Sequence, residues 1–341
     1  MYDVISIGDC YEDIFLKPSK ASILDNRAFS SGKAMCFGYG DKIPLESIDY
    51  HIGGSAANTA INFSKMGFST AVISSVGNDS QGEKISQYLE DHLVDVSQFK
   101  KKNSSASNMS VILSYKGDRT IFTYHGEKDQ SDYLINKSLK TKWIYLAPLG
   151  KETAKIENRI VEVIAKNGSG LIWNPGNYQV ESKARNFRHL LNLCNIIILN
   201  KEEINRFVDA PGRLTLEDSM KKIHDYGARM VVVTDGGNGA SCYDGQVFYK
   251  IRVTEDERVD ATGAGNAFAS SFSAKMILSN TEKPQAFSPS KEIIEQSLKW
   301  GVIVSGSVVS KIGAHEGLMS AEEIEEAEKK LVKLNAEIYA K

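Results

Sequence analysis

Cysteine is scarce in this chain, and the few cysteines lie far apart. The 341 residues contain only Cys10, Cys36, Cys194 and Cys242, with no C-x-x-C pair among them. This spacing argues against a disulfide framework and against a zinc site, and it favours a protein of the reducing cytoplasm.

An excess of one charge and long apolar runs are also lacking. The 41 Lys and Arg residues nearly balance 43 Asp and Glu, for a formal net charge of −2, so we expect no general attraction to nucleic acid or anionic lipid. No apolar run approaches the roughly 20 residues of a membrane helix, and the N-terminus lacks the basic region of a signal peptide. The remaining composition, 42% hydrophobic and 25% charged, excludes disordered, collagen-like and coiled-coil classes.

Short β-branched runs alternate with longer amphipathic stretches. This alternation predicts an α/β fold with a mainly parallel sheet and helices on both faces. Several runs are continuously apolar, as expected for strands buried on both sides. The expected strands are Val4–Ile7, Ala71–Val76, Trp143–Leu146, Leu171–Trp173, Ile196–Leu199 and Met230–Thr234. The expected helices are Ala56–Met66, Gly82–His92, Thr153–Lys166, Leu216–Tyr226, Ala267–Leu278 and a C-terminal helix from the Ser320/Glu323 capping box to near Tyr339.

Two regions interrupt this rhythm. Residues 15–52 hold turn residues and scattered β-formers but no convincing helix, and a structureless loop of that length is unusual in a compact domain. Met109–Tyr115 and Arg119–Thr123 are predicted to pair as a hairpin through Lys116-Gly117-Asp118. We expect both regions to share one small β-layer, a lid or an interface. Residues 279–290, with two prolines, are expected to form an exposed loop between helices.

The strongest local motif is V-D-A-T-G-A-G-N-A-F at 259–268. Gly263, Ala264 and Gly265 lead directly into a helical run, so backbone N–H groups and the positive end of a helix can surround a phosphate or a migrating phosphoryl group. The alternative is an ordinary tight turn with Asn266 as the helix N-cap.

Two further motifs also sit where a ligand could bind. In I-G-G-S-A-A-N-T, paired Gly53 and Gly54 allow a ligand to approach the backbone closely, and Asn58 in the first helical turn offers a donor and an acceptor to a sugar hydroxyl. A purely structural junction between loop and helix explains the motif equally well. At the end of the strand Ile196–Leu199, Asn200 and Glu203 could position hydrated Mg²⁺ and its phosphates. Glu203 as a capping acid is the simpler interpretation.

A glycine-rich turn, T-D-G-G-N-G at 234–239, follows the strand Met230–Thr234. It could border the phosphates or ribose of a nucleotide, but a simple β-hairpin explains it as well. The P-loop, the G-x-G-x-x-G dinucleotide fingerprint after the first strand, the G-x-S-x-G elbow and H-E-x-x-H are all absent from the sequence. A nucleotide-dependent oxidoreductase is therefore disfavoured.

Taken in order, these four elements resemble the ribokinase-like, or PfkB-type, family of sugar and nucleoside kinases. The segment from Asp260 to Asn266 is similar to the family's D-[TA]-x-G-A-G-D signature, and Asp13, five residues after Gly8, matches the acidic residue that holds substrate hydroxyls. The K-G-D-R-T run at 116–120 resembles the hairpin of the family's β-lid. The spelling G-G-S-A-A-N-T leans weakly toward the adenosine-kinase-like branch.

The resemblance implies a single domain over residues 1–341, a three-layer α/β/α fold with lid segments at about 14–52 and 104–125. It implies ATP and Mg²⁺ as cofactors. On this analogy the turn 263–265 is the anion hole, and Asp13, Gly53, Gly54 and Asn58 hold the acceptor. Asn200, Thr234, Gly236 and Gly239 would border the nucleotide. Glu203 would bind Mg²⁺ through water, and Asp260 and Thr262 would lie near a monovalent cation such as K⁺. The lid is also a candidate interface for a homodimer.

One position departs from the family pattern. The last residue of the signature is Asp, the base for the acceptor CH₂OH, whereas this chain has Asn266. An amide cannot accept that proton, and a positioned base contributes roughly 10²–10⁴-fold to the rate. An engineered change, a natural pseudokinase and a different base are all open, with the first two favoured because no acid or histidine neighbours Asn266.

The sequence therefore predicts ATP-dependent phosphorylation of a primary hydroxyl on a sugar or nucleoside, with activity that Asn266 could disable. The competing hypothesis is a sensor that binds a nucleoside or sugar without turnover. Which sugar or nucleoside is bound does not follow from these motifs.

Overall fold

The computed structural model describes residues 1–29, 32–116, 118–126, 133, 135, 139–151, 153–209, 214–254, 258–280, 283–331 and 336–339. Across this part of the chain, ten strands form the main sheet in the order β18-β17-β16-β15-β14-β13-β12-β1-β6-β8. Pairing is parallel from β15 to β8 and antiparallel from β15 to β18. The strands are β1 Tyr2–Ile7, β6 Thr70–Ile73, β8 Val94–Asp95, β12 Thr141–Leu146, β13 Gly170–Trp173, β14 Cys194–Asn200, β15 Met230–Thr234, β16 Ala240–Tyr243, β17 Phe248–Ile251 and β18 Glu337–Tyr339.

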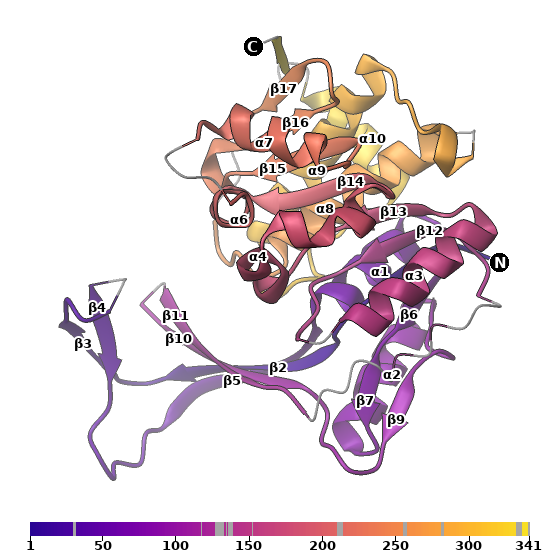
Figure 1. The fold of residues 1–341 in the computed structure, drawn as a ribbon. Helices are drawn as coiled ribbons and strands as arrows, with labels where there is room; N and C mark the ends of the chain where they lie inside the picture. Colours follow the sequence, from indigo (N-terminus) through magenta and orange to yellow (C-terminus); the bar gives the residue numbers. More distant parts are fainter. Residues whose placement is uncertain are drawn as a thin grey trace.

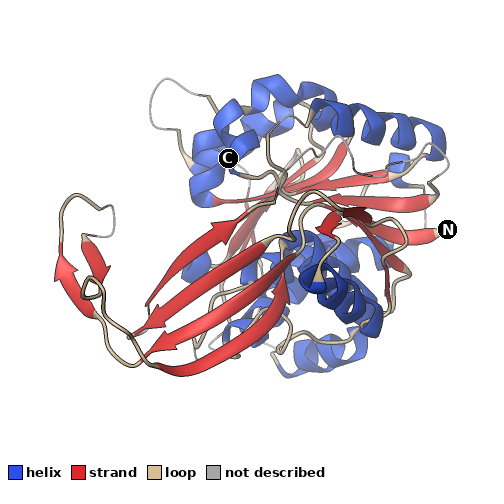
Figure 2. Ribbon diagram, turned by 90° about the horizontal axis from the view of Figure 1, so that it is seen from below, coloured by secondary structure: helices blue, strands red, loops and turns tan. Residues whose placement is uncertain are grey.

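Helices cover both faces of the main sheet, as the alternation of elements predicts (Figure 2). Side chains alternate between the faces along each strand: Val4 packs into one hydrophobic cluster and Ile5 into the other. The first cluster includes residues of α1 Ser55–Lys65, α2 Ser80–Asp91, α8 Ala264–Ser279, α9 Lys291–Val309 and α10 Ala321–Lys330. The second includes residues of α3 Ala154–Asn167, α4 Asn177–Ser182, α5 Arg188–Leu191, α6 Lys201–Phe207 and α7 Leu216–Asp225.

A second sheet projects from the main body, in the order β11-β10-β2-β5 (Figures 1 and 2). We call it the small sheet; its strands are β2 Tyr11–Pro18, β5 Leu45–Gly53, β10 Met109–Tyr115 and β11 Asp118–Tyr124. The hairpin expected in the second region is confirmed, because β10 and β11 pair antiparallel from Met109/Tyr124 to Tyr115/Asp118; Gly117 itself lies outside the described residues. A hairpin of β3 Ser22–Asp25 and β4 Lys33–Cys36 extends from the far end.

Several expectations need correction. The predicted strand Ala71–Val76 is two strands, because after β6 the chain turns at Ser74 and Ser75–Gly77 (β7) pairs with Lys100–Lys102 (β9) in a separate sheet. The predicted C-terminal helix starts at the Ser320/Glu323 capping box but ends at Lys330, and Glu337–Tyr339 add a strand to β17. Part of the expected loop 279–290 is the 3₁₀ turn Pro284–Ala286.

Within the part of the chain that the structure describes, no helix is both long enough and apolar enough to cross a membrane.

Candidate active site

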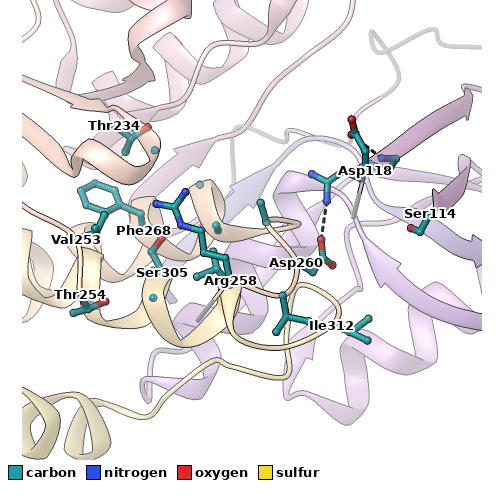
Figure 3. Close-up of a pocket in the computed structure, with 18 of the residues that line it drawn as sticks. Ser114, Asp118, Thr234, Val253, Thr254, Arg258, Asp260, Phe268, Ser305 and Ile312 are labelled. Carbon is teal, nitrogen blue, oxygen red and sulfur yellow. Dashed lines mark hydrogen bonds and ion pairs between the residues drawn. The ribbon is translucent and has the colours of Figure 1, made fainter. Parts of the chain in front are cut away.

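A cavity of about 670 Å³ lies where the small sheet faces the start of α8 (Figure 3). The small sheet contributes Phe15, Lys17 and Arg119, and the glycine-rich turn after β15 contributes Thr234, Gly236 and Gly239. The segment before and within α8 lines another side, together with α9, the residue Ile312 after it and the chain after β17. This volume falls in the range of sites for nucleotide-sized ligands, roughly 300–1,000 Å³.

The turn before α8 can be built only with glycine at its first position. Gly263 has φ = +78°, and a Cβ there would lie 2.8 Å from the Cα of Ala314. Helix α8 starts at Ala264, so Gly263 is the N-cap. The interpretation of Asn266 as an N-cap is therefore wrong: Asn266 is the third helical residue, and among the described residues its side chain has no hydrogen-bond partner. The Ala264 N–H donates to the Ala261 carbonyl (3.4 Å), and Ala264 and Gly265 line the wall of the cavity.

Asp260 joins this turn to the small sheet. Its Oδ1 accepts hydrogen bonds from Arg119 Nη1 (2.7 Å) and Thr262 Oγ1 (2.8 Å), and its Oδ2 accepts one from the Gly313 N–H (3.2 Å). The dashed line to Asp260 in Figure 3 marks the Arg119 contact. Burial alone would raise the pKa of Asp260, but the hydrogen bonds from Thr262 and Gly313 and the charge of Arg119 hold it below the usual range.

Asp13 lies on the face of the small sheet that turns toward the cavity. In the register of β2 it stands beside His51 of β5 and Ser110 of β10. Burial raises the pKa of the Asp13 carboxyl, while a hydrogen bond from Ser110 and the His51 ring partly oppose the increase. Gly53 makes room for this carboxylate, because a Cβ at position 53 would collide with Asp13 Oδ2.

Asn58 stands in the first turn of α1, where its N–H bonds to the Gly54 carbonyl (2.9 Å). Gly54 has φ = +96°, and a Cβ there would lie 2.8 Å from the Cα of Cys10, so a side chain at position 54 is excluded sterically. Asn58 is 7% exposed, and its Oδ1 lies 2.8 Å from His315 Nε2. One turn further, Asn62 donates to Ser270 (2.7 Å), which ties α1 to α8.

The loop Gly313-Ala314-His315, which follows α9, brings these pieces together. Gly313 bonds to Asp260 and packs against the His51 ring, Ala314 packs against Gly263, and His315 contacts Asn58. Three successive residues thus touch the turn before α8, the small sheet and α1. The loop therefore links the elements that carry Gly263, Asp13 and Asn58. The residues predicted from the sequence that line the cavity itself are Thr234, Gly236, Gly239, Asp260, Ala264 and Gly265.

Asn200 and Glu203 form a reciprocal capping box at the start of α6. Asn200 Oδ1 accepts from the Glu203 N–H and Glu203 Oε2 accepts from the Asn200 N–H, both at 2.8 Å. Burial raises the pKa of Glu203 despite the hydrogen bond from Asn200. The simpler interpretation is confirmed, and Glu203 keeps Oε1 for another ligand. Across the described residues, no cluster of three or more His, Cys, Asp or Glu side chains is arranged to hold a metal.

Asn200 pairs directly with Thr234, so the two nucleotide-side motifs adjoin at the carboxyl edge of the sheet. The turn after Thr234 is a hairpin to β16, as the alternative interpretation expected. Gly239 has φ = +94° and a Cβ there would collide with the Ile251 carbonyl. Over this turn lies the guanidinium of Arg258, in the space that a Cβ at Gly237 would need (Figure 3).

The sequence patterns missed three side chains of this site: Arg119, Arg258 and His315. Arg119 lies inside the expected hairpin, yet nothing in a hairpin pattern indicates a partner 141 residues away. His315 follows the unpredicted helix α9. Arg258 immediately precedes the motif at 259–268, and its positive charge beside a turn expected to bind phosphate was a signal that could have identified it.

The family model for the pfkB family of carbohydrate kinases matches residues 25–321, most of the chain. The chain belongs to the pfkB family. Among curated relatives, it is 28% identical to an ATP-dependent 6-phosphofructokinase of Thermoanaerobacterium thermosaccharolyticum over 81% of this chain and 84% of that protein. It is 25% identical to a ribokinase of Lactococcus lactis over 84% and 88%.

Several solved structures have a similar fold. One is a Methanocaldococcus jannaschii nucleoside kinase of the ribokinase family (TM-score 0.74, 17% identity, covering 97% of this chain and 99% of that one). A second is Arabidopsis thaliana ribokinase complexed with ribose and ATP (TM-score 0.73, 19% identity, 95% and 98%). These likenesses show the ribokinase-like α/β fold. The expected family and fold class are confirmed.

Proposed function

We propose that this protein is an ATP-dependent kinase for a primary hydroxyl of a sugar or nucleoside, with Asn266 in place of the base. The observation that carries the proposal is the contact of the loop 313–315 with the turn before α8, the small sheet and α1. A phosphate site and a hydroxyl site side by side are what phosphoryl transfer to an alcohol requires, because positioning and electrostatics dominate that reaction.

The nucleotide half of the site fits ATP. The described wall of the cavity offers backbone turns at 234–239 and 263–265, where extra side chains would clash or protrude, and the cationic groups of Arg258 and Arg119. Backbone N–H groups and cations of this kind favour polyphosphate. In this proposal Asn200, Thr234, Gly236 and Gly239 border the nucleotide, and the N–H groups of 263–265 receive the transferring phosphoryl group.

Mg²⁺ fits as a hydrated ion carried by the phosphates rather than in a protein cage, since Mg²⁺ keeps several waters in such sites. Glu203 would bind it through water with its free Oε1. Nearby, the Tyr145 hydroxyl is buried without a partner among the described residues, and its pKa is raised by burial and by the charge of Glu203. A hydroxyl so placed favours ordered water beside Glu203. When bound, Mg²⁺ would neutralise charge between the phosphates.

The acceptor half of the site uses Asp13 and Asn58, with Gly53 and Gly54 providing close backbone approach. The Asp13 carboxylate accepts a hydrogen bond from an acceptor hydroxyl, and Asn58 orients a neighbouring oxygen. Asn266 occupies the position from which the primary hydroxyl would be deprotonated, and an amide cannot take the proton. A residual rate is compatible with the electrostatic part of the mechanism.

A monovalent cation such as K⁺ does not fit beside Asp260 and Thr262 in this conformation. The Arg119 guanidinium already contacts Asp260 Oδ1 and lies 2.9 Å from Thr262 Oγ1, and the Gly313 N–H takes Oδ2. A second positive charge at this point would be repelled. The proposal therefore contains no step that depends on K⁺.

We further propose that the small sheet, at residues of about 14–52 and 104–125, closes over the acceptor and joins two copies of the chain. Its face away from the cavity exposes Ile48, Tyr50, Phe122 and Tyr124, an apolar patch of the kind that marks interfaces. A cytoplasmic protein that acts on small molecules is consistent with its four free cysteines, of which Cys10, Cys194 and Cys242 are buried and Cys36 is partly exposed. The lean toward the adenosine-kinase-like branch stays a prediction.

The second candidate function is a sensor that binds its ligands without turnover, and Asn266 is the observation that favours it. An ADP-release assay with ribose, adenosine, inosine, fructose, fructose 6-phosphate and ketogluconate separates the two. We expect Asn266→Asp to raise the rate by roughly 10²–10⁴-fold with one acceptor. Asn205→Asp, an exposed change on α6, is the matched control and should do nothing. Ligand binding with no turnover by either the wild type or the Asn266→Asp variant would support the sensor instead.

A further inference from the structure

The imidazole of His315 contacts one polar group through each of its two ring nitrogens. Its Nε2 is 2.8 Å from Asn58 Oδ1, and its Nδ1 is 3.1 Å from the Tyr88 hydroxyl. The ring stacks on Tyr88, with centroids 5.6 Å apart and planes inclined by 29°. These contacts bring α2, α1 and the loop after α9 to one point.

The orientation of the Asn58 amide and the tautomer of His315 are linked. In this structure the amide oxygen faces the ring, and because that oxygen only accepts, Nε2 carries the hydrogen that it shares with Asn58. Removal from water, helped by the nearby His92 and His51 rings, lowers the pKa of His315 to about 3. The ring is therefore neutral near pH 7, its Nδ1 holds a lone pair, and the Tyr88 hydroxyl donates to that lone pair.

With the hydrogen on Nε2, the ring holds the Asn58 amide in this orientation. Rotating the amide by 180° would place its NH₂ group against the Nε2–H, so two donors would face each other unless the ring moved its hydrogen to Nδ1 and the Tyr88 hydroxyl accepted it. The tautomer of His315 therefore reports the orientation of Asn58. The Asn58 Nδ2 has no hydrogen-bond partner among the described residues. Asn58 thus presents donors, and nearby Asp13 presents only acceptors.

We propose that His315 is a positioning residue that holds the Asn58 amide with its NH₂ group toward the acceptor. This rests on the proposed function in one respect, that the acceptor binds at Asn58. The pair then selects an acceptor that donates to Asp13 and offers an oxygen lone pair to Asn58, which neighbouring hydroxyl groups of a sugar or riboside do. An analogue in which the second hydroxyl is replaced by hydrogen leaves the Asn58 donors unpaired.

Two substitutions of His315 separate positioning from simple packing. His315→Gln keeps an N–H donor where Nε2 stands, whereas His315→Leu removes it and frees the Asn58 amide to rotate. Fructose 6-phosphate, ribose and adenosine are titrated calorimetrically in the presence of a non-hydrolysable ATP analogue. We expect His315→Leu to weaken the affinity for whichever of these acceptors binds by about tenfold. His315→Gln should stay within about threefold of the wild type, and affinity for the ATP analogue alone should not change.

Asn58→Ala completes a double-mutant cycle. If His315 acts through Asn58, His315→Leu costs no further affinity once Asn58 is alanine. Equal losses in the Leu and Gln variants, or losses that add fully to that of Asn58→Ala, would overturn the proposal.

A second measurement requires neither an acceptor nor turnover. In ¹⁵N-histidine-labelled protein at pH 7, His315 should give a neutral ring protonated at Nε2, and Tyr88→Phe should shift its Nδ1 resonance. A ring protonated at Nδ1, or a cationic ring, would overturn the positioning role. If this signature is present but none of the three acceptors binds, the proposed function fails and the orientation of Asn58 stands.

Discussion

The start of α8 contains two glycines, Gly263 at the N-cap and Gly265 in the first helical turn, that should respond in opposite ways to the same added methyl group. Gly263 has φ = +78°, and a Cβ there would lie 2.8 Å from the Ala314 Cα; around a Cβ at Gly265 there is no atom within 4 Å. Gly263→Ala incurs about 1–2 kcal/mol for the left-handed backbone and about 1–3 kcal/mol for the steric overlap. We therefore expect the free energy of unfolding to fall by about 2–5 kcal/mol.

Gly265→Ala should leave stability unchanged or raise it by up to about 1 kcal/mol, because alanine is the better helix former. The added methyl group, however, would project from the wall into the cavity, where the phosphoryl group is proposed to bind. A clash of about 1–3 kcal/mol corresponds to a roughly 5- to 150-fold weaker affinity for ATP. Urea unfolding gives the stabilities, and calorimetric titration with ATP and Mg²⁺ gives the affinities.

The contrast between the two variants makes the reasoning refutable. If Gly265→Ala binds ATP as tightly as the wild type, this turn does not receive the phosphates. If Gly263→Ala unfolds at the same urea concentration as the wild type, the close contact with Ala314 does not hold the turn in place.

Two further predictions concern charge. Burial raises the pKa of Asp13 in the folded state. Just above the ordinary pKa of a carboxyl, the folded protein therefore binds more protons than the unfolded chain, and the contribution of Asp13 to stability falls as the pH rises through that window. Asp13→Asn should raise the melting temperature at pH 7 while abolishing acceptor binding, and a lower melting temperature would contradict this. Arg119→Ala should reduce the free energy of unfolding by no more than about 1 kcal/mol, but it should accelerate hydrogen exchange in β11 and make ATP affinity dependent on K⁺. The wild type should bind ATP equally well in KCl and in choline chloride. A wild type whose ATP affinity depends on K⁺ would count against the Arg119 guanidinium as the local cation.

Buried apolar runs made the parallel strands predictable, because their hydrophobicity reflects burial on both faces. The helix α9 Lys291–Val309 went unpredicted, although Ser290, whose side chain accepts a hydrogen bond from the Ile293 N–H, supplied an N-cap signal. Strand β18 went unpredicted because Glu337–Tyr339 extend a charged helical pattern, and only pairing with β17 makes them a strand. Local pattern alone cannot report a tertiary partner.

The candidate site shows the same division. Glycine spacing predicted Gly54 and Gly263 because backbone geometry there excludes a Cβ, and Gly53 because a Cβ there would meet the Asp13 carboxylate. The roles of Arg119 and His315 depend on contacts 141 and 257 residues apart in sequence. No local pattern carries that information, so polar side chains that bridge elements were found only in three dimensions.

The most direct test of the central claim is a crystal structure of the protein with a non-hydrolysable ATP analogue, Mg²⁺ and the acceptor that the ADP-release assay identifies. The account predicts the γ-phosphate at the N–H groups of the turn 263–265 and the primary hydroxyl between that phosphate and Asn266, with neighbouring hydroxyls on Asp13 and Asn58. An acceptor bound elsewhere, or a γ-phosphate distant from this turn, would contradict it.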